Sequence, residues 1–195
     1  MSQINCLAIG CSPRLQGNTS TLLEHAVQGA ESGGARCEKI FLRSFKFSPC
    51  IACDGCHKEG KCVVKDDMQL IYDKLLTADR LILAAPIFSM GINAMGKALV
   101  DRGQRFWATK YILHKPVAPR PEGPERRGIF LSAAGTDLPG VFDCAVRSVK
   151  YYYKVLDVKY LNQYCYSKVD TKGEILHHPI ALSEVFQAGF DLVSN

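Results

Sequence analysis

The residues with the clearest capacity for chemistry are four cysteines within a thirteen-residue run, CIACDGCHKEGKC, at positions Cys50, Cys53, Cys56 and Cys62. Thiolates packed this densely along a chain select soft metals, among them iron–sulfur clusters, zinc and Cu(I). The spacing C-x2-C-x2-C-x5-C has the three-residue rhythm of a short loop wrapped around one cubane cluster. The sequence has no second run to supply the crossed ligand of a two-cluster ferredoxin. The pattern therefore predicts a single cluster.

Zinc and disulfides are the alternatives for these four cysteines. Structural zinc usually takes two C-x2-C pairs separated by a longer loop, whereas the pairs here lie only two residues apart. Disulfides need an oxidising compartment. The first residues, MSQINCLAIG, lack a basic segment followed by an apolar one, so we expect no secretion signal and a reducing cytoplasm. The other five cysteines are isolated in the sequence and are expected to be buried free thiols: Cys6, Cys11, Cys37, Cys144 and Cys165.

A second candidate site is the segment GCSPRLQGNTST, residues 10–21, which follows an apolar run and precedes an amphipathic one. A helix N-terminus at this point favours a phosphate, and Gly17 allows the backbone to approach it closely. Neither G-x-G-x-x-G nor G-x-x-x-x-G-K-[ST] is present, which indicates a single phosphate, as in FMN. Two alternatives stay open: Asn18 and Thr19 cap the helix, and Arg14 lies in solvent.

Apolar runs typical of strands alternate with amphipathic runs typical of helices along the whole chain. Strands are predicted at residues 4–10, 37–42, 80–85, 128–133 and 158–166. Helices are predicted to begin at residues 18–19 and 66–67, and to cover residues 93–109, 139–156 and 180–193. Five such βα units predict an α/β fold with a doubly wound parallel sheet. Anionic ligands bind such sheets at the carboxyl ends of the strands, where the segment 10–21 begins.

Length and composition narrow the class of protein further. With 195 residues, 47% of them hydrophobic and 22% charged, the chain is predicted to form one domain, residues 1–195, with a cysteine-rich loop at 47–65. The longest uncharged apolar run, near residues 81–90, is too short to cross a bilayer. The net charge of +5 is dispersed and forms no aromatic-interleaved basic stripe. We therefore expect neither a membrane nor a nucleic-acid partner.

Four segments of the chain resemble the iron–sulfur flavoproteins, a branch of the flavodoxin-like NAD(P)H-dependent FMN reductase family. They are GCSPRLQGNTSTLL, CIACDGCHKEGKCVVKDDM, AAPIFSMGINAMGKALVDR and VDTKGEILHHP, and the resemblance covers nearly the whole chain. It implies a flavodoxin-like five-stranded sheet of order 2-1-3-4-5, with the cysteine-rich loop inserted after strand 2. The implied cofactors are FMN and one [4Fe–4S] cluster. Flavin-only relatives share the first and third of these segments, so the compact cysteine spacing is what indicates the cluster branch.

The resemblance also assigns residues to the two cofactors. It implies that Ser12, Asn18, Thr19 and Ser20 surround the FMN phosphate, where Arg14 and Gly17 are candidates from the loop sequence itself. It also implies that Pro86, Ile87, Phe88, Ser89, Met90 and Gly91 lie along the isoalloxazine ring. Ala134, Gly135 and Thr136 would close the other side, and the four cysteines would hold the cluster. Many relatives carry tyrosine at the position of Phe88, which lacks the hydroxyl. Core packing is the alternative for Phe88 and Met90. No catalytic side chain is expected, because the chemistry takes place on the cofactors.

The implied function is an FMN-dependent oxidoreductase that passes electrons between a ferredoxin-like carrier and FMN, with O2, H2O2 or quinones as candidate acceptors. Lys58, Lys61 and Lys65 would guide an acidic ferredoxin. A homodimer or homotetramer is implied, in which the cluster and flavin of different subunits approach each other. One alternative is a flavin-only NAD(P)H-dependent FMN or quinone reductase, with the cysteines vestigial or zinc-bound. The other is a non-enzymatic redox sensor or zinc-stabilised binding module.

Overall fold

Strands and helices alternate in the computed structural model, which describes residues 3–118 and 123–194. The strands are β1 (Asn5–Gly10), β2 (Arg36–Phe41), β3 (Arg80–Phe88), β4 (Gly91–Ile92), β5 (Arg127–Ala133) and β6 (Lys159–Tyr166). The helices are α1 (Asn18–Ser32), α2 (Cys56–Glu59), α3 (Met68–Thr77), α4 (Ala94–Arg102), α5 (Gln104–Trp107), α6 (Asp143–Val155) and α7 (Ala181–Ser194). A π-helix covers Ala108–Ile112, and single 3-10 turns cover Leu42–Ser44 and Glu174–His177.

The main sheet has the order β2-β1-β3-β5-β6, and all its neighbouring strands are parallel. This confirms the expected flavodoxin-like order, in which the fourth and fifth predicted strands are β5 and β6. The short strand β4 pairs antiparallel with the end of β3 and was not predicted. Two residues are too few to show a period of two, so sequence periodicity could not reveal it.

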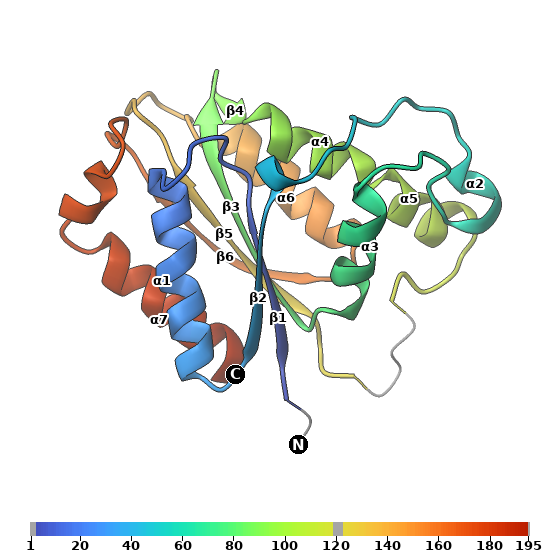
Figure 1. Ribbon diagram of the computed structural model, residues 1–195, viewed down its shortest axis with the longest axis horizontal. Coiled ribbons are helices and arrows are strands. Elements are labelled where there is room, and N and C mark those ends of the chain that lie inside the picture. Colours follow the sequence, from blue (N-terminus) through green and yellow to red (C-terminus); the bar gives the residue numbers. More distant parts are fainter. Residues whose placement is uncertain (1–2, 119–122, 195) are drawn as a thin grey trace.

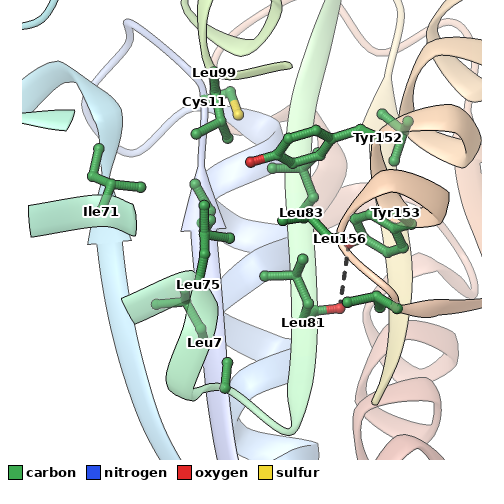
Figure 2. Close-up of a cluster of buried hydrophobic side chains, with 14 of the residues drawn as sticks. Leu7, Cys11, Ile71, Leu75, Leu81, Leu83, Leu99, Tyr152, Tyr153 and Leu156 are labelled. Atoms are coloured by element: carbon green, nitrogen blue, oxygen red, sulfur yellow. Dashed lines mark hydrogen bonds between the residues drawn. The ribbon is translucent and has the colours of Figure 1, made fainter. Parts of the chain in front are cut away.

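Helices cover both faces of the sheet (Figure 1). Helices α1 and α7 lie on one face, and α3, α4, α5 and α6 lie on the other. Each face carries its own hydrophobic cluster. Figure 2 shows the second face, where Leu81 and Leu83 of β3 pack with Tyr152 and Tyr153 of α6. Strand β3 is buried on both faces along most of its length, which explains its nearly continuous apolar sequence.

Two glycines let α1 and α7 pack with their backbones in contact. A Cβ atom on Gly29 of α1 would lie 1.9 Å from the carbonyl oxygen of Phe186, and one on Gly189 of α7 would lie 1.9 Å from that of Ala26. Any larger residue at either position would push the two helices apart. This contact fixes α1, whose N-terminus points to the carboxyl edge of the sheet.

The structure shifts several predicted boundaries. The N-cap of α1 is Gly17, so the prediction that the side chain of Asn18 or Thr19 caps this helix is wrong. The helix predicted at 93–109 consists of α4, α5 and the π-helix. Helix α6 begins at Asp143 instead of residue 139, because Gly140 adopts a positive φ of 72° and turns the chain first. Residues 119–122, which belong to the segment 115–127 rich in proline and charge before β5, lie outside the described residues.

Within the two described ranges, we find no helix that combines the length and the hydropathy of a membrane span.

Candidate functional site

Two adjoining cavities lie at the carboxyl ends of the parallel strands, and we call them together the carboxyl-edge site. The first is lined by Ser12, Arg14, Gly17, Asn18, Thr19, Pro86, Ile87, Phe88, Ala133, Gly135, Val169 and Asp170. The second is lined by Ile87, Phe88, Ser89, Met90, Ala134, Gly135, Thr136, Leu138, Val141 and Asp170. Among the flavin residues expected from the sequence, only Ser20 and Gly91 line neither cavity. The structure therefore brings three separate sequence segments together, as the parallel topology requires.

The first cavity includes the N-terminus of α1. No acidic side chain lies in the first turn of this helix, so the helix itself offers no charge that offsets its positive dipole end. Ser12 and Thr19 are 4% and 2% exposed. A Cβ atom on Gly17 would lie 3.1 Å from Oγ of Ser12 and 3.2 Å from Cβ of Arg14, so only glycine leaves this space open. The cradle fits a single anionic group such as a phosphate.

Two of the expected phosphate ligands have side chains engaged elsewhere. Nδ2 of Asn18 donates to the carbonyl of Thr171 at 3.0 Å, and Oδ1 of Asn18 accepts from the backbone N–H of Gly173 at 3.0 Å. Arg14 donates through Nη1 to the carbonyl of Asp170 at 3.0 Å. These bonds join the α1 loop to the segment after β6. Ser20 is buried, and its hydroxyl has no hydrogen-bond partner among the described residues.

The wall of the second cavity is a tight turn between β3 and β4. Ser89 and Met90 have positive φ angles of 49° and 64°, as the two central residues of a type I′ hairpin do. Such angles strain non-glycine residues, and strain of this kind concentrates at functional sites. Phe88 and Met90 are 49% and 38% exposed, so the alternative that they pack in the core is wrong. Asn93 is buried and donates through Nδ2 to the carbonyl of Cys11 at 2.7 Å, which holds this turn against the α1 loop.

Sequence reasoning missed the contribution of the segment after β6. Val169 and Asp170 line the first cavity, and Asp170 also lines the second. A Cβ atom on Gly135 would lie 2.9 Å from Cβ of Asp170, so these two loops touch across the site. The position of this segment in the chain could have indicated its role, because the loop after the last parallel strand must begin at the same edge of the sheet as the others.

The four cysteines of the predicted cluster loop line one cavity, which we call the cysteine site. The wall of this cavity also contains Tyr72, Gln104 and the guanidinium groups of Arg102 and Arg105. Burial raises the pKa of the Cys56 thiol, and the neighbouring thiols of Cys62, Cys50 and Cys53 raise it further, which places all four within electrostatic range. Among the described residues, no three His, Cys, Asp or Glu side chains converge on a single metal-ion position. The four thiols line a shared space.

Arg102, at the end of α4, anchors both ends of the cysteine loop. Its side chain is 1% exposed and forms a bidentate pair with Asp66, with Nη1–Oδ2 at 2.6 Å and Nη2–Oδ1 at 3.0 Å. Nη1 also donates to the carbonyl of Ser48 at 2.9 Å, and Nη2 lies 3.5 Å from Sγ of Cys62. Burial raises the pKa of Asp66, but hydrogen bonds from Arg102 and from backbone N–H groups hold it below its ordinary value overall.

A second arginine fixes the middle of the cysteine loop. Nε of Arg105 donates to the carbonyl of Gly60 at 3.0 Å, and the hydroxyl of Thr109 lies 3.4 Å from the same oxygen. Gly60 ends α2 with a φ of 71°, and a Cβ atom there would lie 2.3 Å from Oγ1 of Thr109. Two guanidinium groups therefore stand beside four thiols, a donor set suited to an anionic metal–sulfur centre.

Comparison with known proteins gives a family match over most of the chain. The model of the family described as NADPH-dependent FMN reductase matches residues 4–136. An iron–sulfur flavoprotein of Methanocaldococcus jannaschii is 38% identical over 98 residues, which are 50% of this chain and 51% of that protein. An iron–sulfur flavoprotein of Methanosarcina thermophila is 36% identical over 94 residues, 48% and 49% of the two chains. The chain thus spans about half the length of the curated relatives it matches.

Solved structures support the fold more broadly. The NAD(P)H:quinone oxidoreductase from Methanothermobacter marburgensis superposes with a TM-score of 0.74, covering 98% of this chain and 96% of that one. Its sequence identity is 16%, so the similarity concerns the fold alone. Together with the family match and the named relatives, it confirms the resemblance expected from the sequence.

Proposed function

This chain belongs to the NADPH-dependent FMN reductase family, and on that basis we propose that it is an FMN-dependent oxidoreductase that also holds one [4Fe–4S] cluster. The observation that carries the proposal is the gathering of Cys50, Cys53, Cys56 and Cys62 around one cavity of a family scaffold. FMN when bound supplies one- and two-electron chemistry, and the cluster supplies one-electron transfer. We treat residues 47–65 as the cluster-binding loop of a single FMN-binding domain.

The carboxyl-edge site is the proposed FMN site. The N-terminus of α1 with Ser12, Gly17 and Thr19 would receive the phosphate, with the backbone of residues 18 and 19 completing the cradle. The turn from Pro86 to Gly91 would lie along the ring, and residues 134–136 would close the opposite side. Asp170 lines both cavities, so we assign its carboxylate to the hydroxyl-bearing ribityl chain between phosphate and ring.

The cysteine site is the proposed cluster site. A tetrahedral zinc ion needs its ligands to converge on one centre, whereas a cubane takes one thiolate at each of four separate irons. The compact spacing of the four cysteines, in place of two separated C-x2-C pairs, favours the cluster over zinc. Arg102 and Arg105 would offset the charge of the thiolates, and the hydrogen bond from Arg102 would reach Cys62 directly.

The two proposed sites lie apart within one chain, which supports an oligomer. Their cavities share no lining residue. In Figure 1 the cysteine loop with α2 extends to one end of the molecule, while β4 and the N-terminus of α1 lie elsewhere. Large apolar side chains are exposed at both places, among them Ile51 and Val63 near the cysteines and Phe88 and Leu138 at the carboxyl edge. We propose a homodimer or homotetramer in which these faces meet.

The proposed electron partner is a ferredoxin-like carrier. Lys58, Lys61 and Lys65 are exposed beside the cysteine site and would attract an acidic protein. A cytoplasmic location would keep the thiols reduced and available to the cluster. The downstream acceptor belongs to the class of O2, peroxide or quinones.

An electron-transfer assay tests this proposal. Anaerobic protein is mixed with reduced ferredoxin or with NAD(P)H, and bleaching of the flavin absorption is followed for the wild type and for Cys53→Ala. We expect reduced ferredoxin to bleach the wild-type flavin rapidly and the variant slowly. Equal rates in both proteins, with fast reduction by NAD(P)H, would instead establish the flavin-only reductase. If the protein binds no flavin under any condition, the non-enzymatic redox sensor or zinc-stabilised binding module is the alternative that is left.

A further inference from the structure

Cys6 and Cys37, which look isolated in the sequence, are direct neighbours in the fold. Cys6 lies in β1 and Cys37 in the adjacent edge strand β2, and the two residues are paired in the parallel register. Directly paired residues on neighbouring strands place their side chains on the same face of the sheet, with Cα atoms about 4.7–4.9 Å apart. A disulfide needs a Cα–Cα separation of about 4.4–6.8 Å. The register therefore meets the backbone requirement for a bond between these two sulfurs.

The two thiols differ in access and in character. Cys6 is 2% exposed, while Cys37 is only partly buried, and Sγ of Cys37 lies 4.0 Å from the carbonyl oxygen of Val27 in α1. The interaction between the two thiols raises the pKa of Cys6 and lowers that of Cys37. Lys39 lowers the pKa of Cys37 further, against the opposing effects of burial and of Glu31. The accessible thiol is thus also the more readily ionised one.

We propose that Cys6 and Cys37 form a redox-active dithiol, which a peroxide converts into an intrachain disulfide that ties β2 to β1. In the first step the Cys37 thiolate attacks a peroxide oxygen; an S–O bond forms and the O–O bond breaks. The released oxygen takes up the proton that Cys37 lost on ionisation and leaves as water or alcohol. In the second step the Cys6 sulfur attacks the Cys37 sulfur; the S–S bond forms and the S–O bond breaks. The departing hydroxide takes the Cys6 proton and leaves as water. Two thiols lose two electrons, and one peroxide gains them.

This site is separate from the proposed cofactor sites. Cys6 is the second residue of β1, so the pair lies toward the amino ends of the strands, whereas the carboxyl-edge site begins after Gly10. Neither Cys6 nor Cys37 lines the cysteine site. The dithiol needs no flavin and no cluster, so it can be tested whether or not either cofactor is present. The disulfide would close a loop that contains all of α1 and would restrain the edge strand.

The test uses the full chain, purified anaerobically with whatever cofactors it retains. The protein is treated with stoichiometric hydrogen peroxide and then denatured in the presence of iodoacetamide, which alkylates the remaining thiols. It is digested without reduction, and the peptides are mapped by mass spectrometry. We expect a Cys6–Cys37 linked peptide as the main product, two hydrogens lighter than its reduced parts. Exposed Cys144 offers a matched single thiol, and Cys144→Ser should form the same link to the same extent.

Two variants separate the roles of the two sulfurs. Cys6→Ser should stop the reaction at a Cys37 sulfenic acid that dimedone captures, and Cys37→Ser should leave Cys6 reduced. If either variant fails to fold, the wild-type peptide map still shows whether the Cys6–Cys37 link forms. Recovery of Cys6 as an alkylated thiol while Cys37 is oxidised would overturn the proposal. So would random linkage of Cys37 to the four cysteines of the cysteine site. Iron and flavin assays on the same samples report separately on the proposed function.

Discussion

The carboxyl-edge site and the cysteine site are held in place in different ways. The carboxyl-edge site consists of turns that directly follow β1, β3, β5 and β6, so the sheet itself sets their spacing. The cysteine site lies on an insertion between β2 and α3, and side chains of α4 and α5 fix its position. A site formed by strand ends keeps its shape when its ligand is absent. A loop held by a few side-chain contacts opens more easily.

The largest effect that this comparison predicts is a selective loss of the cluster. Cys53→Ala removes one thiolate from the cysteine site and leaves the carboxyl edge untouched. We expect bound iron to fall from about four atoms per chain to nearly none, with FMN content and affinity unchanged. Iron, sulfide and flavin assays on anaerobically purified protein measure this. The exposed thiol of Cys144 provides the control, since Cys144→Ala should keep both cofactors. Loss of FMN together with iron in Cys53→Ala would contradict two independent sites.

The next effect concerns the arginine that anchors the cysteine loop. Arg102→Met leaves Asp66 without its charged partner, and breaking a mostly buried ion pair costs about 3–5 kcal/mol in the free energy of unfolding. We expect a large drop in the urea midpoint, increased hydrogen exchange confined mainly to residues 47–66, and loss of cluster iron. FMN binding should persist in the protein that remains folded.

The same helix supplies a matched control for Arg102. Lys97 and Asp101 form an exposed i,i+4 ion pair on α4, and Lys97→Met should cost only about 0.5 kcal/mol or less. Arg102→Lys keeps the charge but loses the bidentate geometry. Its loss of unfolding free energy should therefore lie between those of Arg102→Met and Lys97→Met. If Arg102→Met and Lys97→Met lower the free energy of unfolding by the same small amount, Arg102 is not the anchor of the loop.

A smaller effect concerns the carboxyl-edge site, where a substitution should weaken FMN binding and leave the cluster in place. Gly17→Val places side-chain atoms within the space bounded by Ser12 and Arg14 and moves the phosphate away from α1. We expect FMN affinity to weaken about tenfold, which corresponds to about 1.4 kcal/mol, while iron content stays at the wild-type level. Fluorescence titration of apoprotein with FMN measures the affinity. Unchanged affinity would exclude this loop as the phosphate cradle.

The smallest effect is a pH dependence of the loop anchor. The pKa of Asp66 is below its ordinary value in the folded protein, so its stabilising effect is complete above the unfolded-state pKa near 3.9 and disappears as pH falls through the folded-state value. The difference in unfolding free energy between wild type and Asp66→Asn, measured by urea titration of apoprotein, should therefore be constant at neutral pH and shrink below about pH 4. A difference that grows on acidification would have the wrong sign for this account.

The sequence predicted the fold and indicated which candidate residues would lie close together, because these signals are local. Alternating apolar and amphipathic segments predicted the parallel α/β sheet, and the family resemblance predicted its strand order. The short spacing of the four cysteines indicated the cysteine site. Almost all expected flavin residues line the carboxyl-edge cavities, since loops after parallel strands must meet at one edge. Their binding roles remain predictions.

The features that the sequence did not reveal depend on contacts between distant segments. Arg102 lies 40 positions from Cys62, and nothing in its neighbourhood marks it as the partner of Asp66. Asn18 has the composition of a cap, but its side chain binds a loop more than 150 positions away. Cys6 and Cys37 become neighbours only through the register of β1 and β2. Each of these requires the three-dimensional pairing that periodicity cannot supply.

Cofactor stoichiometry under strict anaerobiosis tests the central claim most directly. One sample of purified protein is analysed for absorption, iron, acid-labile sulfide, zinc and FMN. Our account predicts flavin bands on a broad iron–sulfur shoulder, with about four iron and four sulfide per chain beside one FMN. Flavin bands with no iron, or with zinc in the place of iron, would contradict the presence of a cluster in the cysteine site.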